Sequence, residues 1–413
     1  MPKALPIFFL FLILSGCRTM QGPPAPAPAA PAPQASLSPP FPPPDPPLGP
    51  PPEPAPEPLE GQSAGLLVER VLLRMSLEQK IGQRIVSGVP GTRLAERTRR
   101  LVREGRLGGV LLGRQNVAGR EQLKAFTGEL QQAALAGSPP VGLLIAVDQE
   151  GGRVSRLELP GLTRFASPRV WAGYQDPDFI EAVAYITSRE VLELGCNLNL
   201  APVLDLYSGG EATVIGDRSL GAEAEQVAVR GLAYLRGARR AGIAAAVKHF
   251  PGHGRTTVDT HQRPAALAID AETLWEQDLL PFRRAVEYGV EAVMTAHVLY
   301  PQLDPQYPAT LSEVLVRGLL RGRMGYRGVV ISDDIEMGAI KGRFPLREVL
   351  KQAIRAGVDI ILEFGGLDAL KLIEEVKVLL RDGELTMEQI EEGTRRVLGL
   401  KQRCGLLPLQ GES

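Results

Sequence analysis

The segment KHFPGHGRTTVDTH, residues 248–261, holds three of the four histidines in this 413-residue chain. The Pro-Gly pair at 251–252 breaks any regular helix there. Asp259 precedes His261 by two residues in a Thr-rich stretch. A carboxylate bonded to one imidazole nitrogen fixes the tautomer and raises the basicity of the other nitrogen. This pair could therefore act as a general acid and base near neutral pH.

Three interpretations of His249, His253 and His261 compete. A metal site is suggested by the i, i+4 spacing of His249 and His253, but that spacing faces one way only on a helix. In the second interpretation, the histidines are polar loop residues whose hydrogen bonds are made with the backbone. This interpretation suits His253 best. The third is the acid/base dyad, which alone accounts for Asp259.

A partner for such an acid lies in "ISDDIEM", where Asp333 comes directly after an apolar strand and Asp334 follows it. A carboxylate held there could attack the anomeric carbon of a sugar or stabilise an oxocarbenium-like transition state. A nucleophile plus a proton donor is the outline of a retaining glycosidase. The acid would here be a histidine in place of the usual second carboxyl group.

The scaffold that must position these groups is indicated by short β-rich runs alternating with segments of helical periodicity. The expected strands are 85–88, 109–112, 142–147, 197–200, 244–247, 292–295, 328–332 and 358–362. The expected helices include 120–135, 177–194, 222–240, 271–288, 312–323 and 346–356. Eight strands, each followed by a helix, predict an α/β fold, a (β/α)₈ TIM-type barrel forming a single catalytic domain. A doubly wound open sheet is the alternative, but no Gly-x-Gly-x-x-Gly turn follows an early strand.

Polar residues cluster just after these strands. They are Asp148 and Glu150 after the third, Asp205 after the fourth, Lys248 and His249 after the fifth, His297 after the sixth, and Asp333 and Asp334 after the seventh. Strand ends of that polarity converge on one face of a barrel. All four histidines are therefore expected in a single pocket. Capping boxes at 76–79, 310–313 and 386–389 predict three helix starts.

Composition excludes some functions. The 46 basic and 47 acidic residues give a net charge of −1, so nothing indicates a nucleic-acid partner. The basic stretch 97–100 is interpreted as the solvated face of a helix. Besides Cys17, the cysteines are Cys196 and Cys404, too few for a disulfide framework or a four-cysteine zinc site. Cys196 is expected to be a buried, inert thiol.

The N-terminus predicts export. Lys3 and the apolar run 4–14 form a secretory signal that is too short to span a bilayer. Leu-Ser-Gly-Cys at 14–17 resembles the lipobox of bacterial lipoproteins, so residues 1–17 are the predicted signal, with Cys17 lipidated. An ordinary signal with an incidental cysteine is the alternative. No aspartate follows Cys17, which favours a cell-envelope location at the outer membrane in a cell with two membranes.

Residues 18–60 are the predicted linker. Positions 23–58 hold 19 of the 36 prolines and almost no large apolar side chains, so this segment cannot bury a core and is expected as disordered polyproline II. At about 3.1 Å per residue it could reach roughly 100 Å. The segment would hold a catalytic domain, expected at 61–413, away from a lipid anchor.

Six motifs in this order are similar to those of glycoside hydrolase family 3, and most of all to its bacterial β-N-acetylglucosaminidases. They are DQEGGRV at 148–154, NLAPVLDL at 199–206, IGDRSLG at 215–221, KHFPGHGRTTVDTH at 248–261, AVMTAH at 292–297 and VVISDDIEMGAI at 329–340. The resemblance covers about residues 66–400. It implies an enzyme of cell-wall turnover with no metal, no cofactor and no obligate protein partner.

The same resemblance implies a role for each matching residue. Asp333 would be the nucleophile, His261 the acid/base and Asp259 its orienting partner. The residues implied to hold the N-acetylglucosamine ring are Asp148, Arg218, Lys248 and His249, with His253 and Met337 as weaker candidates for the same pocket. His297 would support them from behind.

Two positions depart from the family pattern: Arg255 stands where members often carry aspartate, and Leu220 where phenylalanine is usual. Both leave the subsite preference open. No large second domain follows the expected barrel, which favours the hexosaminidase branch. A family 3 β-glucosidase, a phosphorylase that uses phosphate in place of water, and a non-catalytic lipoprotein that binds the cell wall remain as alternatives.

Overall fold

The structure is a computed structural model that describes residues 59–207, 209, 214–366 and 368–408, with side chains from residue 65. The predicted signal at 1–17, including Cys17, and the linker up to residue 58 lie outside the described residues. The first helix, α1 (Leu59–Arg74), begins two residues before the predicted start of the catalytic domain at 61.

Eight parallel strands form a closed ring. They are β1 (Ile85–Gly88), β2 (Gly109–Leu112), β3 (Leu144–Val147), β6 (Leu198–Asn199), β7 (Ala244–Phe250), β9 (Ala292–Thr295), β12 (Val329–Ile331) and β13 (Ile361–Glu363). Their order in the sheet follows the chain, and β13 pairs back with β1. A bridge between Ile331 and Ile360 joins the last two strands. The predicted (β/α)₈ barrel is confirmed, and closure excludes the open sheet.

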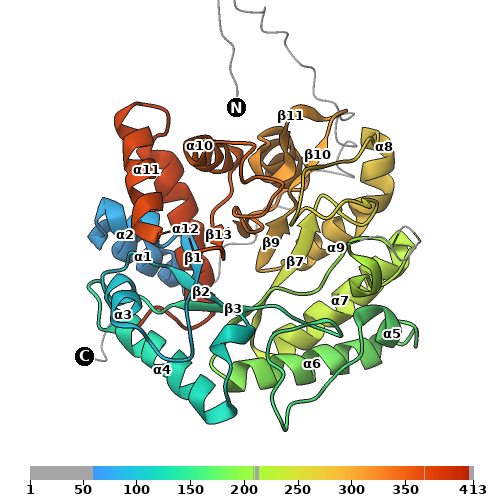
Figure 1. Cartoon of the computed structure of the whole chain (residues 1–413), viewed down its shortest axis with the longest axis horizontal. Helices are drawn as coiled ribbons and strands as arrows, with labels where there is room; N and C mark the ends of the chain where they lie inside the picture. Colours follow the sequence, from blue (N-terminus) through green and yellow to red (C-terminus); the bar gives the residue numbers. More distant parts are fainter. Residues whose placement is uncertain (1–58, 208, 210–213, 367, 409–413) are drawn as a thin grey trace, which may run out of the picture. The chain divides into compact units, whose positions relative to one another are not determined.

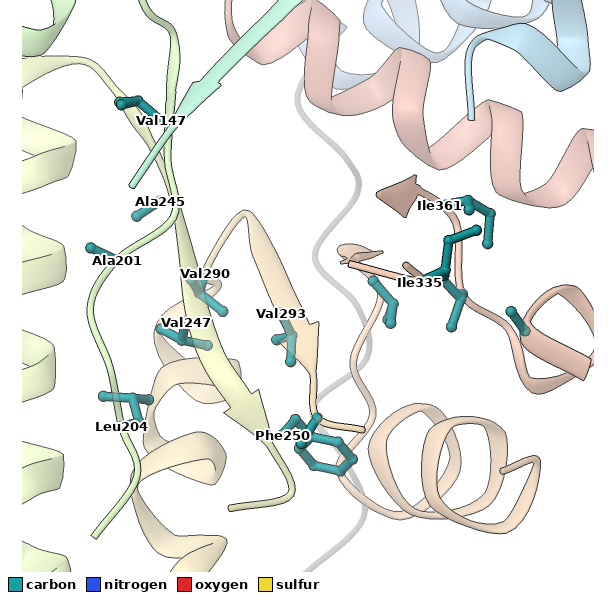
Figure 2. Packing of buried hydrophobic residues seen from close by; sticks show 14 of the residues in the cluster. Val147, Ala201, Leu204, Ala245, Val247, Phe250, Val290, Val293, Ile335 and Ile361 are labelled. Atoms are coloured by element: carbon teal, nitrogen blue, oxygen red, sulfur yellow. The ribbon is translucent and has the colours of Figure 1, made fainter. Parts of the chain in front are cut away.

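Side chains alternate between the two faces of the ring. On β3, Leu144 and Ala146 face the barrel interior, while Ile145 and Val147 face the helices. Figure 2 shows part of the outer layer, with Val147 beside the β7 side chains Ala245 and Val247. Burying each such side chain contributes about 1.5–3 kcal/mol for residues the size of valine or leucine. Two apolar faces per strand explain why the strands appear in the sequence as short continuous apolar runs.

Helices surround the ring of strands (Figure 1). Besides α1 they are α2 (Leu77–Gly82), α3 (Glu96–Arg103), α4 (Arg120–Leu135), α5 (Pro168–Ala172), α6 (Pro177–Glu193), α7 (Ala224–Ala241), α8 (Ala271–Thr273), α9 (Leu280–Tyr288), α10 (Leu346–Ala356), α11 (Ala369–Arg381) and α12 (Met387–Arg403). The predicted helices 120–135 and 346–356 coincide with α4 and α10, and the basic stretch 97–100 lies in α3. Within the described part of the chain, no helix is long and apolar enough to cross a membrane.

Two predicted helices differ in kind from the expectation. The segment 271–288 is divided into α8, a π-helical turn at Leu274–Asp278, and α9. The segment predicted at 312–323 is π-helical over Val314–Arg323. Helical periodicity in a sequence does not distinguish i→i+4 from i→i+5 hydrogen bonding over one or two turns.

One of the three predicted capping boxes is wrong. Ser76 and Thr386 cap α2 and α12 as expected. Thr310 is fully buried, and its hydroxyl lies 3.0 Å from the carbonyl of Ala296. The hydroxyl of Ser312 accepts from the N–H of Leu315 in its place.

Short elements extend the barrel at the carboxyl ends of its strands. They are the hairpin of β4 (Gln149–Gly151) and β5 (Val154–Ser155), the sheet of β8 (Ala265–Ala266), β10 (Val298–Tyr300) and β11 (Asp304–Pro308), and 3₁₀ turns at Arg114–Asn116, Gly216–Arg218 and Ala309–Leu311. At the opposite end, Val397 and Leu400 of α12 pack into the interior cluster. Cys196 is buried, and burial raises the pKa of its thiol to about 12, in agreement with the predicted inert thiol.

Candidate active site

A cavity of about 630 Å³ opens where the carboxyl ends of the strands converge. Its floor contains interior side chains of the barrel, among them Leu111, Leu200 and Met294. The predicted site residues that line it are Asp148, Arg218, Lys248, His249, Asp259, His261, Asp333 and Met337. Segments separated by almost two hundred positions in the chain thus meet in one pocket, because every strand end points the same way.

Asp333 lies two residues after the end of β12, and one oxygen of its carboxylate accepts the N–H of Asp334 at 2.8 Å. Burial by itself would raise the pKa of Asp333, but nearby histidines, chiefly His249 and His297, and the Asp334 N–H lower it below its ordinary range. The carboxylate is therefore ionised at neutral pH. An ionised carboxylate at the floor of a cavity has the charge and position that a nucleophile requires.

Asp334 is held differently from its neighbour. Its carboxylate accepts the N–H groups of Glu336 and Phe364, each at 3.0 Å. Burial raises the pKa of Asp334. Two backbone N–H groups thus hold Asp334 in the turn after β12, whereas the carboxylate of Asp333 accepts one.

The Asp259–His261 pair has the geometry of a dyad. Nδ1 of His261 lies 2.8 Å from Oδ1 of Asp259, and the backbone N–H of His261 donates to the same oxygen at 2.9 Å. Burial raises the pKa of Asp259, but these two donors outweigh it and the net direction is down. The ionised carboxylate holds the proton on Nδ1, which leaves Nε2 for proton exchange with a bound molecule.

The loop that carries Asp259 and His261, called the dyad loop below, is hydrogen-bonded to the segment that carries Asp333. The N–H of Gly338 donates to the carbonyl of His261, and the N–H of Ala339 donates to the carbonyl of Thr260, both at 3.0 Å. A side chain at Gly338 would collide with the backbone of Gln262. The close approach of two backbones thus couples the position of His261 to the position of Asp333.

A charged wall on the other side of the cavity is formed by Asp148, Glu150, Arg218 and Lys248. Nζ of Lys248 lies 2.6 Å from a carboxylate oxygen of Asp148 and 2.6 Å from one of Glu150. Arg218 forms a bidentate pair with Glu150 at 2.8 Å for both bonds. Burial opposes ionisation of Glu150, but Arg218 and Lys248 hold its pKa far below the ordinary value. These donors are fixed before any ligand arrives.

His249 completes this wall. Its Nδ1 lies 2.6 Å from the carboxylate of Asp205, which also accepts the backbone N–H of His253 at 2.6 Å. Burial would raise the pKa of Asp205, but His249 lowers it on balance. Asp205 therefore orients the imidazole of His249 and anchors the start of the 248–261 segment at once.

The expectation that all four histidines share one pocket is wrong for two of them. His253 is buried outside the lining, with its ring nitrogens 3.0 Å and 2.7 Å from the hydroxyls of Thr260 and Thr256. Burial lowers the pKa of His253 to about 4, so its ring is neutral at pH 7. The interpretation as a satisfied polar loop residue fits His253, and the structure does not place it against the sugar.

His297 lies behind the segment that carries Asp333. Its Nε2 is 2.9 Å from the carbonyl oxygen of Asp334, which can only accept, so Nε2 carries a proton. Burial lowers the pKa of His297, and its Nδ1 lies 2.8 Å from the hydroxyl of Thr310. His297 therefore supports the turn that carries Asp333.

The departures at Arg255 and Leu220 do not reach the cavity. Nε of Arg255 lies 3.0 Å and 2.9 Å from the two carboxylate oxygens of the buried Asp278. Leu220 is buried in the outer core. Neither side chain lines the pocket.

Sequence reasoning placed Glu150 and Asp205 at the strand ends but gave no role to them or to Arg156; the structure places Arg156 in the cavity lining and the other two directly behind it. The i, i+2 spacing of Asp148 and Glu150 puts both on one face of an extended strand, a signal that could have identified Glu150. Arg156 lines the cavity, and its guanidinium has no partner among the described residues. Nothing local in the sequence distinguishes Arg156 from the other exposed arginines.

A (β/α)₈ barrel whose pocket contains a carboxylate and a histidine–aspartate pair is typical of a glycoside hydrolase. Comparison with known proteins identifies the family. The model of the glycosyl hydrolase family 3 N-terminal domain matches residues 76–400. A beta-hexosaminidase of Alkalilimnicola ehrlichii is 40% identical over 284 residues, which is 67% of this chain and 79% of the relative. The chain belongs to glycosyl hydrolase family 3.

Solved structures are similar over most of the chain. A family 3 β-N-acetylglucosaminidase from Paenibacillus sp. strain FPU-7 is 40% identical with a TM-score of 0.77 and matches 82% of this chain, which spans 64% of that protein. A β-N-acetylhexosaminidase from Beutenbergia cavernae is 31% identical with a TM-score of 0.72, over 79% of this chain and 99% of its own.

Proposed function

We propose that this protein is an exo-acting, retaining β-N-acetylglucosaminidase that removes terminal β-linked N-acetylglucosamine from peptidoglycan-derived or related glycans. The observation that carries the proposal is the meeting of Asp333 with the Asp259–His261 dyad in one cavity. The hexosaminidase names of the relatives support the choice of sugar. A pocket closed below by the apolar barrel interior accepts the end of a glycan chain better than its middle.

The reaction proceeds in two steps. In the first, the carboxylate of Asp333 attacks the anomeric carbon while the glycosidic oxygen takes a proton from Nε2 of His261, so the leaving sugar departs as an alcohol. In the second, a water gives a proton to Nε2 of His261 and attacks the anomeric carbon, which frees Asp333. Asp259 stabilises the imidazolium form of His261 before the first step and after the second.

The charged wall binds the sugar. Lys248, Arg218 and His249 are donors to hydroxyl and carbonyl oxygens, and Asp148 accepts from hydroxyl groups. Arg156 adds a guanidinium that no described protein group occupies. Because the wall is already fixed by its own ion pairs, binding requires little ordering of side chains.

The test uses residues 59–413 with chromogenic β-N-acetylglucosaminide and β-glucoside, beside Asp333→Asn. Hydrolysis of the N-acetyl substrate alone, abolished in Asp333→Asn, is expected. Turnover of the glucoside at an equal rate would move the enzyme to the β-glucosidases. No turnover of either sugar together with measurable N-acetylglucosamine binding would support the non-catalytic, wall-binding alternative.

Phosphorolysis is a second candidate, favoured by the exposed histidine acid and by the arginines Arg114, Arg153 and Arg156 in the cavity lining. A histidine does not repel an anion as a carboxylate would. Adding phosphate distinguishes the two reactions. Hydrolysis predicts an unchanged rate and free N-acetylglucosamine, whereas phosphorolysis predicts a faster rate and the sugar 1-phosphate.

We also propose that the enzyme is anchored to the cell envelope through a lipid on Cys17, at the outer membrane in a cell with two membranes. The support is the sequence Leu-Ser-Gly-Cys at 14–17 and the absence of aspartate after Cys17. In cell fractionation the full chain is expected with the membranes, and Cys17→Ala is expected in the soluble fraction. An equal distribution of both proteins would contradict the anchor.

A further inference from the structure

Phe364 follows β13 and is the single phenylalanine, tyrosine or tryptophan among the described residues that line the cavity. Its side chain is about 38% exposed, whereas the aliphatic floor residues, such as Leu362 and Met294, are 2–3% exposed. The N–H of Phe364 donates to the carboxylate of Asp334, which in turn is bonded to Asp333 through its own N–H. The aromatic ring is therefore tied, two hydrogen bonds away, to the nucleophile.

Two glycines make room for this ring. A Cβ on Gly88, at the end of β1, would lie 2.7 Å from Cδ2 of Phe364, and a Cβ on Gly113, after β2, would lie 2.6 Å from Cζ. Gly113 has φ −114°, a backbone conformation that any residue can adopt. Glycine is needed there because a larger side chain would collide with Gln115 and Phe364. The ring thus packs against the backbone of β1 and β2.

The wall on this side of the pocket differs from the charged wall. Beside Phe364, the lining consists of Gly113, Arg114 and Gln115, and Arg114 is engaged by Glu158 in an ion pair of 2.5 Å. An apolar ring next to an amide is the combination that recognises a pyranose, whose faces carry C–H groups and whose edge carries hydroxyls. The groups that hold the terminal sugar come from the segments after β3, β6 and β7, so this wall is left for another part of the substrate.

We propose that Phe364 is the stacking platform for the leaving sugar, the one on the other side of the cleaved bond, and that Gly88 and Gly113 set its position. This inference rests on the proposed hydrolysis of terminal N-acetylglucosamine and names the group that selects a sugar as the leaving group. Phe364 is a specificity residue for the leaving group and takes no part in proton transfer.

The test compares two substrates that share the terminal sugar. N,N′-diacetylchitobiose places a sugar on the platform, and N-acetyl-β-D-glucosaminyl fluoride leaves the platform empty. Aryl glycosides are avoided because their aromatic ring could stack on Phe364. In Phe364→Ala, kcat/KM for the disaccharide is expected to fall about tenfold, which corresponds to about 1.4 kcal/mol, while the fluoride changes less than about twofold.

Two further variants sharpen the assignment. Gly88→Ala keeps the phenylalanine but displaces its ring, because the three atoms nearest to the added Cβ all belong to Phe364, so it is expected to lower the disaccharide rate alone. Phe364→Tyr keeps a ring of the same shape and is expected to retain the rate. Phe179→Ala is the matched control, because Phe179 is also 38% exposed but lies on α6, outside the cavity lining.

The outcomes that would contradict this inference differ from the outcome that would contradict the proposed function. An equal loss on both substrates would place Phe364 against the terminal sugar and overturn the inference. An unchanged disaccharide rate in Phe364→Ala would overturn it as well. Fluoride turnover near the wild-type rate shows that the variant folds, whereas a wild-type protein inactive on both substrates would refute the proposed function itself.

Discussion

The charged wall and the dyad loop lie on the same pocket but are built in opposite ways. In the wall, the side chains of Lys248 and Glu150 are 2% and 1% exposed, and each ion has two partners. In the loop, the side chain of His261 is 62% exposed, with Asp259 as its only ring partner among the described residues. In the proposed mechanism, binding therefore uses donors locked in place, whereas proton transfer uses a group in contact with water, with which it must exchange protons.

This difference predicts how the two regions respond to substitution. The wall is part of the folded core, so damage to it should lower stability together with binding. In the loop, the side chains of His261 and Asp259 are 62% and 36% exposed, so substitution of these two residues should lower activity with little loss of stability.

The largest effect on activity is expected from the loop. His261→Ala removes the proton donor and should lower kcat on N,N′-diacetylchitobiose by about 10²–10⁴-fold, with a much smaller loss on the glycosyl fluoride, which leaves without a proton. Steady-state kinetics on both substrates checks this prediction. Thr257→Ala, at an exposed position of the same loop, is the control and should match the wild type. A loss of stability in His261→Ala comparable to that of a core variant would remove the distinction between the regions.

Substitution in the charged wall should lower the stability of the protein. Glu150→Gln leaves Arg218 and Lys248 buried with one carboxylate fewer, and the free energy of unfolding is expected to fall by about 3–5 kcal/mol. Denaturant unfolding at pH 7 measures it. Glu158→Gln, which breaks the exposed pair with Arg114, is the matched control and should cost less than about 1 kcal/mol.

The wild type and Glu150→Gln are also expected to differ in how their stability depends on pH. The pKa of Glu150 lies below its ordinary value of 4.5 in the folded protein. Its contribution to stability is therefore complete above about pH 4.5 and is lost as the pH falls toward the folded-state pKa. The gap in unfolding free energy between wild type and Glu150→Gln should narrow below pH 4.5. A gap that widens on acidification would contradict the ion-pair account.

The smallest effect on activity is expected at Arg255. Because its guanidinium pairs with the buried Asp278 and does not line the cavity, Arg255→Ala should lower the unfolding free energy by about 1–3 kcal/mol. Its kcat/KM on both substrates should remain within about twofold of the wild type. A changed preference between N-acetylglucosaminide and glucoside would show that Arg255 affects sugar specificity and would contradict this prediction.

The barrel and the meeting of its strand ends were predictable from the sequence because both follow from local patterns. Buried parallel strands are continuous apolar runs, and parallel topology brings polar residues such as Asp148, Lys248 and Asp333 together. Long-range pairings were not predictable in this way. The partner of Arg255 is Asp278, in a π-helical turn that has no sequence signature distinct from an α-helix. The burial of His253 also depends on Thr256 and Thr260, which only the folded loop brings against its ring.

Trapping of the covalent intermediate tests the central claim most directly. The 5-fluoro derivative of N-acetyl-β-D-glucosaminyl fluoride should inactivate the enzyme by forming a slowly hydrolysed ester, which peptide mass spectrometry can locate. The account predicts a single labelled residue, Asp333. Label on Asp334 or on another carboxylate, or steady turnover of the substrate with no labelled peptide, would contradict it.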